Sequence, residues 1–418
     1  MLQRGRLLVF FVSAFVALYG ISAIFYGKVV AEDDAYKKLE VLMDALDRVN
    51  RDYVEVPDMN KVQEGAMRGL IDALDPYSSF LSKEQFAEIE KRKAAPASTG
   101  MIISKRSDVI AVITVAPGSP ADEAGVRAGD YLVAVDDESV EDRTVIEVNS
   151  MLRGEPDSKV KISLFRSSRT KPLEFELTRK PDVAKPIESR MIDGNVGLLV
   201  IASLEDSMAE QARIKLKTLI SAGAEKVILD LRNCANGTAT EATEISNFFL
   251  RDELIYYSKN RRDEKVQEVK ADPEKFITDL PMVVLINGST AGGAEIIAGA
   301  LKDQKRAKIV GERSFGIGSA QRQIQLKSGA IVILTVAKYC TPSGKVIQME
   351  DSIRDTGIKP DIQAPDEDKR QDLAVESYYD SQDDEGKYKQ LLEKISKIQL
   401  DKAIEILSEE QAPLKKAA

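Results

Sequence analysis

The chain has no histidine and no tryptophan, and only two of its 418 residues are cysteine. Without an imidazole, a Ser-His-Asp or Cys-His hydrolase site is excluded. A zinc site built from a Cys/His cluster is excluded for the same reason. Cys234 and Cys340 lie far apart in the sequence and do not make a disulfide framework. Whether they pair stays open, and two small apolar core residues are the simpler interpretation.

The chain also lacks a cluster of basic residues. Its formal net charge is −9, and its Lys and Arg residues are scattered among acidic ones. No basic patch is large enough to neutralise phosphates, which argues against nucleic acid as a partner. No glycine-rich phosphate loop follows a predicted strand and no Cys/His cluster is present, so we expect neither a nucleotide cofactor nor a metal. With 43% apolar residues, the chain can bury a large core in two or three domains.

The longest stretch without charge lies at the N-terminus. Residues 7–26 contain no charged side chain, and Arg4 and Arg6 precede them. A helix of about 20 residues spans about 30 Å, the thickness of a bilayer core. We therefore predict that residues 1–31 are an inner-membrane anchor and that the remaining chain faces the periplasm or the cell exterior. The alternative is a long signal peptide that is cleaved after Ala31, which would give a secreted protein.

Beyond this segment the patterns change three times. Residues 32–95 are predicted to be helical, with Leu39, Leu42 and Met43 on one helix face. Residues 96–180 contain short β-branched runs typical of strands, such as 109–115. Residues 184–362 alternate strands with helices, which is typical of a parallel α/β layer. Its predicted strands are Val196 to Ile201, Lys226 to Asp230, Met282 to Ile286 and Ile331 to Lys338.

Residues 363–418 form the last predicted segment. The part from Ala364 to Asp384 is acidic and polar, and we expect it to be mobile because it cannot bury enough apolar surface. A helix follows, with Leu391, Ile398 and Leu407 on its apolar side. This helix either packs against its own chain or forms a dimer contact.

Several motifs arrive in the order of a known family. An apolar run that ends at Ile286 leads into a small-residue turn and a helix beginning near Glu295. The stretch from Asn287 to Gln321 resembles the active-site region of the carboxyl-terminal processing, or tail-specific, serine peptidases. The resemblance runs from about Tyr36 to Leu407. It also includes four further segments: Asp75 to Leu81, Pro117 to Asp137 with its PDZ-like pattern, Asp230 to Arg232, and Gly357 to Asp361.

The resemblance implies a fold and a site. The implied fold is an α/β peptidase core with an inserted PDZ domain. In this family a Ser attacks, a Lys takes its proton and a Gln orients the Lys. Aligned without a gap, the nucleophile position falls on Gly292, the base position on Ile317 and the orienting position on Gln321. Gly has no atom that attacks and Ile exchanges no proton, so this chemistry cannot run from these positions.

The family's oxyanion loop is altered as well. The resemblance assigns oxyanion amides to Gly293 and to the loop at Asn236 and Gly237, where the family's Asn and first Gly have become Cys234 and Asn236. We also considered whether neighbouring side chains replace the missing pair. The candidate hydroxyls and amines are Ser289, Thr290, Ser314, Ser319, Lys302, Lys305, Lys308 and Lys327. The simpler interpretation is that each hydroxyl bridges a turn and each Lys is solvated.

The PDZ resemblance implies a peptide-binding loop at Thr99, Gly100, Met101 and Ile102, where the usual loop would hold a C-terminal carboxylate. For Met101 and Ile102 the alternative is core packing. We therefore predict an envelope protein that lacks catalysis and binds protein tails or extended peptides, pairs with itself, or regulates a related peptidase. The alternative function is an active serine endopeptidase that cleaves proteins near their C-termini with a displaced catalytic pair.

Overall fold

A computed structural model describes residues 39–106, 109–182, 186–349, 356–366, 373 and 385–409. The predicted anchor and nearly all of the acidic segment after Ala364 lie outside these residues. Within the described ranges, no helix is long and apolar enough to cross a membrane. The chain divides into two compact units, Met1–Leu70 and Ile71–Ala418.

The described part of the first unit is largely helical, in agreement with the prediction for residues 32–95. One helix covers residues 39–52, and α2 covers Met59–Asp72, which extends two residues into the second unit. Leu39, Leu42 and Met43, which the spacing places on one face, are exposed.

The start of the second unit is tied to the core by the Asp75–Ser78 turn. The Asp75 carboxylate accepts the backbone N–H groups of Tyr77 at 2.8 Å and Ser78 at 2.9 Å. It also accepts the Thr335 hydroxyl at 3.1 Å, and the Ser78 hydroxyl accepts the Thr335 N–H at 3.0 Å. The Asp75–Ser78 turn is therefore hydrogen-bonded to strand β18 (Ile331–Cys340) through Thr335. After it come β1 (Ser79–Leu81) and α3 (Lys83–Lys93), the latter with a Ser82 capping box.

The strand-rich region forms a separate sheet with its own core. Its strand order is β3-β4-β5-β7-β8, with β6 paired to β5, and β2 pairs with β9 beside it. The strands are β2 (Ala97–Ser98), β3 (Met101–Arg106), β4 (Val109–Val115), β5 (Tyr131–Val135), β6 (Glu138–Ser139), β7 (Lys159–Phe165), β8 (Leu173–Thr178) and β9 (Lys180–Pro181). The helices are α4 (Pro120–Glu123) and α5 (Val145–Leu152). Strand β3 lies at the edge of this sheet, and its neighbour α5 contacts it.

The α/β core is built on a six-stranded sheet in the order β10-β11-β12-β15-β16-β19, in which only β10 is antiparallel. The strands are β10 (Glu188–Ile192), β11 (Val196–Val200), β12 (Lys226–Asp230), β15 (Met282–Ile286), β16 (Lys308–Gly311) and β19 (Ile362–Gln363). Three predicted strands of the parallel layer are confirmed here. Because both faces of the sheet are covered, these strands contain continuous apolar runs and do not alternate with polar residues; Lys226 and Asp230 lie only at the ends of β12.

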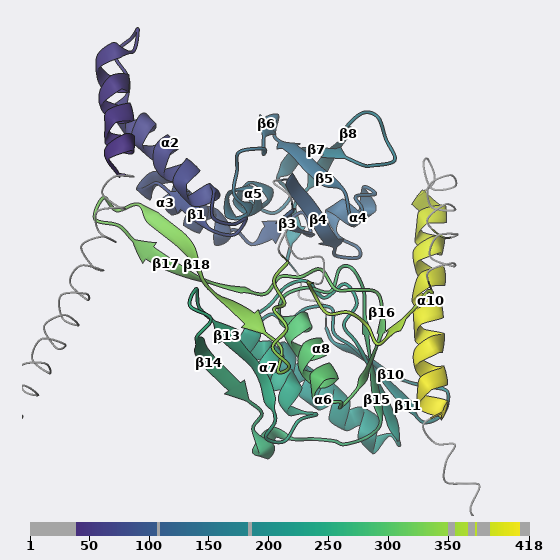
Figure 1. The fold of residues 1–418 in the computed structure, drawn as a ribbon. Helices are drawn as coiled ribbons and strands as arrows, with labels where there is room; N and C mark the ends of the chain where they lie inside the picture. The colour runs from purple at the N-terminus through teal and green to yellow at the C-terminus, as the bar shows by residue number, and fades with distance from the viewer. Residues whose placement is uncertain are drawn as a thin grey trace, which may run out of the picture. The chain divides into compact units, whose positions relative to one another are not determined.

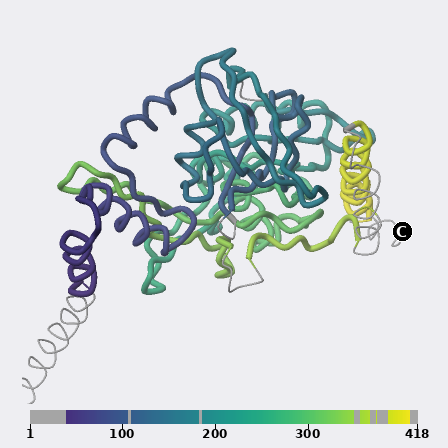
Figure 2. The backbone as a smooth tube through the Cα atoms, turned by 90° about the horizontal axis from the view of Figure 1, so that it is seen from above, coloured from purple at the N-terminus to yellow at the C-terminus, as the bar shows by residue number. Residues whose placement is uncertain are grey.

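Helices cover each face of this sheet (Figure 1). On one face Leu199, Leu229 and Val284 pack in a cluster with α6 (Met208–Ser221), α7 (Ala239–Asn247) and α8 (Gly293–Asp303). On the other face Leu198 and Leu285 pack in a cluster with the C-terminal helix α10 (Glu385–Glu409). Figures 1 and 2 both show α10, in yellow, beside the sheet. The C-terminal helix therefore packs against its own chain, which is one of the two interpretations of the sequence.

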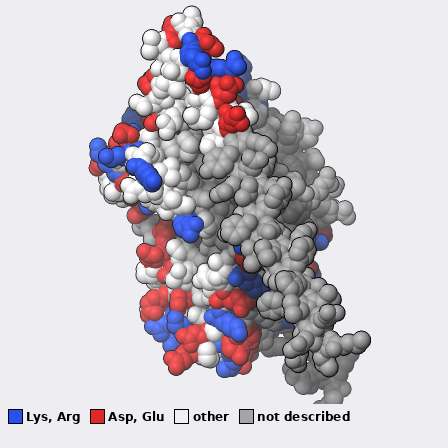
Figure 3. Space-filling view, turned by 60° about the vertical axis from the view of Figure 1, so that its left-hand side comes forward, with Lys and Arg blue, Asp and Glu red and all other residues white. Residues whose placement is uncertain are grey.

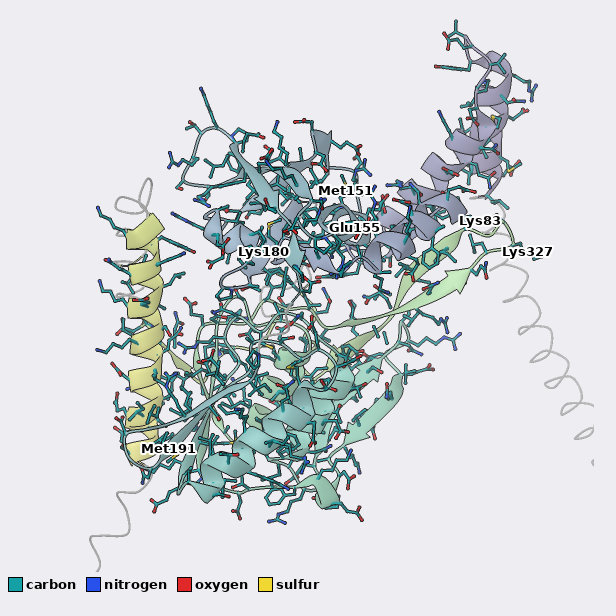
Figure 4. All side chains as sticks on the ribbon, turned by 180° about the vertical axis from the view of Figure 1, so that it is seen from behind. Lys83, Met151, Glu155, Lys180, Met191 and Lys327 are labelled. Carbon is teal, nitrogen blue, oxygen red and sulfur yellow. The ribbon has the colours of Figure 1, made fainter. Side chains whose placement is uncertain are left out.

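The fourth predicted strand of the parallel layer belongs elsewhere. Residues 331–340 form β18, the central strand of an antiparallel sheet in the order β1-β18-β13-β14, with β17 paired to β18. The other strands are β13 (Leu254–Lys259), β14 (Lys265–Lys270) and β17 (Ser319–Gln325), and η1 (Pro273–Lys275) follows β14. The prediction was wrong because an apolar run indicates a strand but not its partners. At the turn between β17 and β18, Gly329 lies against Lys83, and Figure 4 labels Lys83 beside Lys327 there.

Candidate functional site

The turn between β15 and α8 holds the position predicted for a nucleophile. Strand β15 ends at Ile286 and α8 begins at Gly293, so Gly292 is the residue that precedes the helix. Gly292 has φ 62° and ψ −121°, a conformation that L side chains rarely adopt. A Cβ at this position would meet no atom within 4 Å. The turn thus has open space for a side chain, on a backbone that favours glycine.

Glu295 joins this turn to the predicted base position. Its side chain is fully buried in the first turn of α8. Its Oε2 accepts the N–H of Gly292 at 3.1 Å and the N–H of Ile317 at 2.7 Å. Its Oε1 accepts the N–H of Gly316 at 2.8 Å and the hydroxyl of Ser314. Two positions 25 residues apart in the sequence therefore meet at one carboxylate oxygen.

Opposing effects act on this carboxyl group. Burial raises the pKa of Glu295 to about 7, while hydrogen bonds from Ser314, Ile317, Gly292 and Gly316 favour the charged form and lower it. The sequence analysis identified Glu295 only as the start of a helix. It missed that the Glu295 carboxylate joins Gly292 to Ile317. The available signal was a Glu at the third residue of a helix that begins after a glycine.

The three residues predicted to supply oxyanion amides also come together. Gly237 has φ 107°, and a Cβ there would lie 2.0 Å from the carbonyl oxygen of Leu204. A Cβ on Gly293 would lie 2.9 Å from the carbonyl oxygen of Thr238 and 3.0 Å from Leu204 Cδ1. At both positions a side chain would collide with the neighbouring segment at Leu204 or Thr238, so both positions require glycine. Asn236 is held at this point through its Nδ2, which donates to Glu205 at 2.9 Å.

Gln321, the predicted orienting residue, lies on β17. Its Nε2 donates to the hydroxyls of Ser319 at 2.8 Å and Thr335 at 3.4 Å, and the side chain is exposed. Gln321 is thus part of the β17–β18 ladder, which begins two residues after Ile317.

The hydroxyls nearest to Gly292 already have backbone acceptors. Ser289 Oγ donates to the carbonyl oxygen of Ile113 at 2.6 Å, and Thr290 Oγ1 donates to that of Leu231 at 2.9 Å. Both side chains are buried. The Ser314 hydroxyl donates to Glu295, as described above. Thr290 also bridges its own turn by accepting the Asn287 N–H at 3.0 Å, whereas the Ser289 hydroxyl bonds to strand β4 and the Ser314 hydroxyl to α8.

The nearby amines lie away from the turn or have other partners. Lys302 donates to the carbonyl oxygen of Lys359 and lies 3.2 Å from Asp361. Lys305 and Lys308 are exposed after α8. Lys327 lies at the far end of the β17–β18 hairpin (Figure 4). None of these contacts pairs an amine with a hydroxyl beside Gly292.

The two cysteines are free and buried. Burial raises the pKa of the Cys234 thiol to about 12, and the charge of Asp230 acts in the same direction. A thiol that stays protonated is a poor nucleophile. Cys234 contributes instead through its carbonyl oxygen, which accepts the N–H of Ala291 at 2.9 Å.

The predicted peptide-binding loop leads into the edge strand β3. Gly100 has φ 80°, and a Cβ there would lie 2.1 Å from Ser119 Cβ. Its N–H donates to the hydroxyl of Ser98 at 3.1 Å. Thr99 is buried, and its hydroxyl has no hydrogen-bond partner among the described residues. Met101 packs in the core of this sheet, as the alternative interpretation expects, whereas Ile102 packs against a different cluster.

Comparisons with known proteins agree with this architecture. A model of peptidase family S41 matches residues 195–364, and a PDZ domain model matches residues 112–166. The carboxy-terminal-processing protease of Bartonella bacilliformis is 31% identical over 336 residues, which cover 79% of this chain and 76% of that protein. The carboxy-terminal processing protease CtpA of Bacillus subtilis is 30% identical over 368 residues, which cover 87% of this chain and 77% of that protein.

A solved structure agrees as well. The photosystem II D1 C-terminal processing protease superposes with a TM-score of 0.65 and 27% identity, covering 77% of this chain and 91% of that chain. A PDZ sheet combined with this α/β core defines a PDZ-containing peptidase fold. The chain belongs to the carboxy-terminal processing proteases of peptidase family S41.

Proposed function

We propose that this protein is a catalytically silent member of its family and that it binds protein C-termini through its PDZ domain. One observation carries the first part. Gly292 and Ile317, the positions predicted for nucleophile and base, share one oxygen of Glu295, and neither has a side chain for the chemistry. The hydroxyls of Ser289 and Thr290 already donate hydrogen bonds to backbone carbonyl oxygens, which argues against either of them as a displaced nucleophile.

Cleavage of an unfolded substrate tests whether the protein lacks peptidase activity. We expect the natural full-length chain to leave a casein-like substrate intact, and a Gly292→Ser, Ile317→Lys double variant to gain cleavage. The matched control is Gly288→Ser with Ile317→Lys, because Gly288 also faces open space but lies four residues earlier. Cleavage by the natural chain that a serine-reactive phosphonate abolishes would contradict the proposal and identify an active endopeptidase.

The proposed ligand is a free C-terminal tail. An extended peptide adds as a strand to an exposed sheet edge, with its carboxylate held by amides of the preceding loop. In this chain the edge is β3 and the loop contains Gly100. The names of the relatives from Bartonella bacilliformis and Bacillus subtilis, which describe processing at C-termini, support the same class of partner.

Binding of labelled peptides tests the ligand class. We expect peptides with a free carboxylate to bind the full-length chain at least about tenfold more tightly than their amidated forms. Gly100→Ala should weaken binding, because its Cβ would collide with Ser119. Gly118→Ala is the matched control, since Gly118 also has a positive φ but no atom within 4 Å of a Cβ. Equal affinity for both peptide forms would contradict tail recognition.

We further propose that the protein works at the cell envelope, held there by residues 7–26. The uncharged segment after Arg4 and Arg6 supports this location. In that setting a silent member can pair with itself or with a related peptidase and present tails to it.

A further inference from the structure

The C-terminal helix α10 contacts two parts of the molecule. Its C-terminal half packs on the parallel sheet, where Ala403 and Leu407 are fully buried. Gln399 is also buried, and it donates to the carbonyl oxygen of Ala364 at 2.9 Å and accepts from Arg232 at 3.0 Å. These contacts fix this half of the helix on the α/β core.

The first turns of α10 contact the PDZ domain instead. The guanidinium carbon of Arg127 lies 4.0 Å from the ring centroid of Tyr388, which is a cation–π contact. One residue further along, the Lys389 amine lies 3.9 Å from the Asp122 carboxylate of α4. Figure 1 shows α4 beside this end of α10. The helix therefore extends from the core sheet to the PDZ domain.

A well-fixed part of the PDZ domain carries Arg127. Its backbone N–H donates to the Asp130 carboxylate at 2.8 Å, and the residue is buried. Asp130 is also paired with Arg166 at 2.7 Å, and Arg166 donates to the carbonyl oxygen of Gly125 at 2.8 Å. The neighbouring Val126 belongs to the PDZ core. Because the turn between α4 and β5 is tied to this core, a contact at Arg127 holds the whole domain.

The two ends of α10 differ in strength. The core end buries apolar side chains in a large cluster, and burial of that kind is the strongest stabilising term in a fold. At the PDZ end, the side chains of Lys389 and Asp122 are 50% and 29% exposed, so solvent screens their attraction. The half-buried ring of Tyr388 makes the stronger contact of the two. This end of the helix therefore depends mainly on Tyr388 and is the weaker end.

We infer that α10 is a strap between the two domains: its C-terminal half is anchored on the core, and its first turns hold the PDZ domain at the turn between α4 and β5 through Tyr388. Because the PDZ end is the weaker one, the strap opens there while its core half stays in place. The C-terminal helix thus controls how freely the PDZ domain moves on the core. The inference stands on the contacts of α10 and does not depend on whether tails bind or whether the protein cleaves peptides.

Hydrogen exchange in the full-length chain measures the two ends of the strap separately. Amides of residues 125–130 report the PDZ turn, those of 389–395 report the first turns of α10, and those of 399–407 report its core end. We expect Tyr388→Ala to speed exchange at 125–130 and at 389–395 at least about threefold, because the ring that Arg127 contacts is lost. Exchange at 399–407 should stay unchanged. Weaker helix propensity cannot cause the effect, since Ala favours a helix more than Tyr does.

Three further variants complete the test. Arg127→Ala removes the cation from the PDZ side and should speed exchange across the contact, at 389–395. Tyr388→Phe keeps the aromatic ring, and Leu392→Ala changes an exposed side chain of the same helix, so both should exchange like the natural chain. Acceleration across the contact in either Arg127→Ala or Tyr388→Ala, with 399–407 unchanged, supports the inference. Any other pattern overturns it, including equal acceleration at 399–407 or the same acceleration in Tyr388→Phe.

Discussion

Gly292 combines open space with a backbone that disfavours every other residue. Its φ of 62° and ψ of −121° are unfavourable for an L side chain, although a Cβ would touch nothing. A non-glycine residue in such a region costs roughly 1–3 kcal/mol. Glycine adopts this conformation without that cost.

The cost of a side chain at position 292 is measurable. We predict that Gly292→Ser lowers the free energy of unfolding by roughly 1–3 kcal/mol, because the backbone is strained and not because of a clash. Gly288→Ser, in the same turn but with an unstrained φ, should change stability by less than about 0.5 kcal/mol. Urea unfolding of both variants compares the two sites. Equal midpoints would show that the turn relaxes without strain.

Glu295 makes stability depend on pH near neutrality. Its pKa rises from 4.5 to about 7 because the carboxyl is buried, so the folded chain binds a proton that the unfolded chain has lost between these values. Stability is then greatest below about pH 5 for this group and falls as pH rises towards 7. The slope is at most about 1.4 kcal/mol per pH unit. No histidine titrates in this window, since the chain has none.

We predict that Glu295→Gln removes this slope between pH 5 and pH 7. The variant should also be less stable, because a Gln cannot accept from all four donors that surround Glu295. Glu241→Gln is the matched control, since Glu241 also lies at the third residue of a core helix and accepts the N–H of Ala209. It should keep the slope of the natural chain. Urea unfolding at several pH values measures the unfolding free energy of the natural chain and of both variants. If this energy changes with pH equally in all three chains, Glu295 is not the group that causes the slope.

At the scale of elements, α10 shows how one helix serves the sheet. Its apolar face, with Ala403, Ile406 and Leu407, covers strands of the parallel sheet. Arg232, which is paired with Asp230 at the end of β12, donates to the Ser396 carbonyl oxygen and to Gln399, both at 3.0 Å. The helix is therefore a structural layer of the core.

Two leucines of α10, one buried and one exposed, show how the cost of a Leu→Ala substitution depends on burial. We predict that Leu407→Ala, at a fully buried site, costs about 2–4 kcal/mol of unfolding free energy. Leu392→Ala on the same helix, where the side chain is 47% exposed, should cost well under about 1 kcal/mol. Chemical unfolding of both variants gives the comparison. Similar losses at both sites would mean that Leu392 is covered in solution, as a dimer contact requires.

The elements also show what the sequence can and cannot predict. The runs at 226–230 and 282–286 were predicted as strands and are confirmed, because a short β-branched stretch between turn residues has few alternatives. The run at 331–338 was assigned to the wrong sheet, since strand partners are set by tertiary packing. The family resemblance, which assigned the nucleophile and base positions to Gly292 and Ile317, implied that these residues lie close together. The contact between Ser289 and Ile113 joins residues 176 apart, and no local pattern indicates it.

At the scale of the whole molecule, charge is spread out. On the face drawn in Figure 3, acidic and basic side chains are interleaved over the described residues, without a broad basic area. The net charge of −9 has the same implication. Long-range attraction to nucleic acid or to an anionic surface is therefore weak, so any membrane association would depend on an apolar segment.

Residues 7–26 are the segment that we propose for this role, and the proposal can be tested directly. We predict that the full-length chain stays with the membrane fraction after an alkaline carbonate wash, because a span of about 20 apolar residues inserts effectively irreversibly. A variant that lacks residues 7–26 should be recovered in the soluble fraction. Mass spectrometry of the N-terminus distinguishes the alternative, since cleavage after Ala31 would begin the mature chain at Glu32. Recovery of the uncleaved chain in the soluble cytoplasmic fraction would contradict both the anchor and the signal peptide.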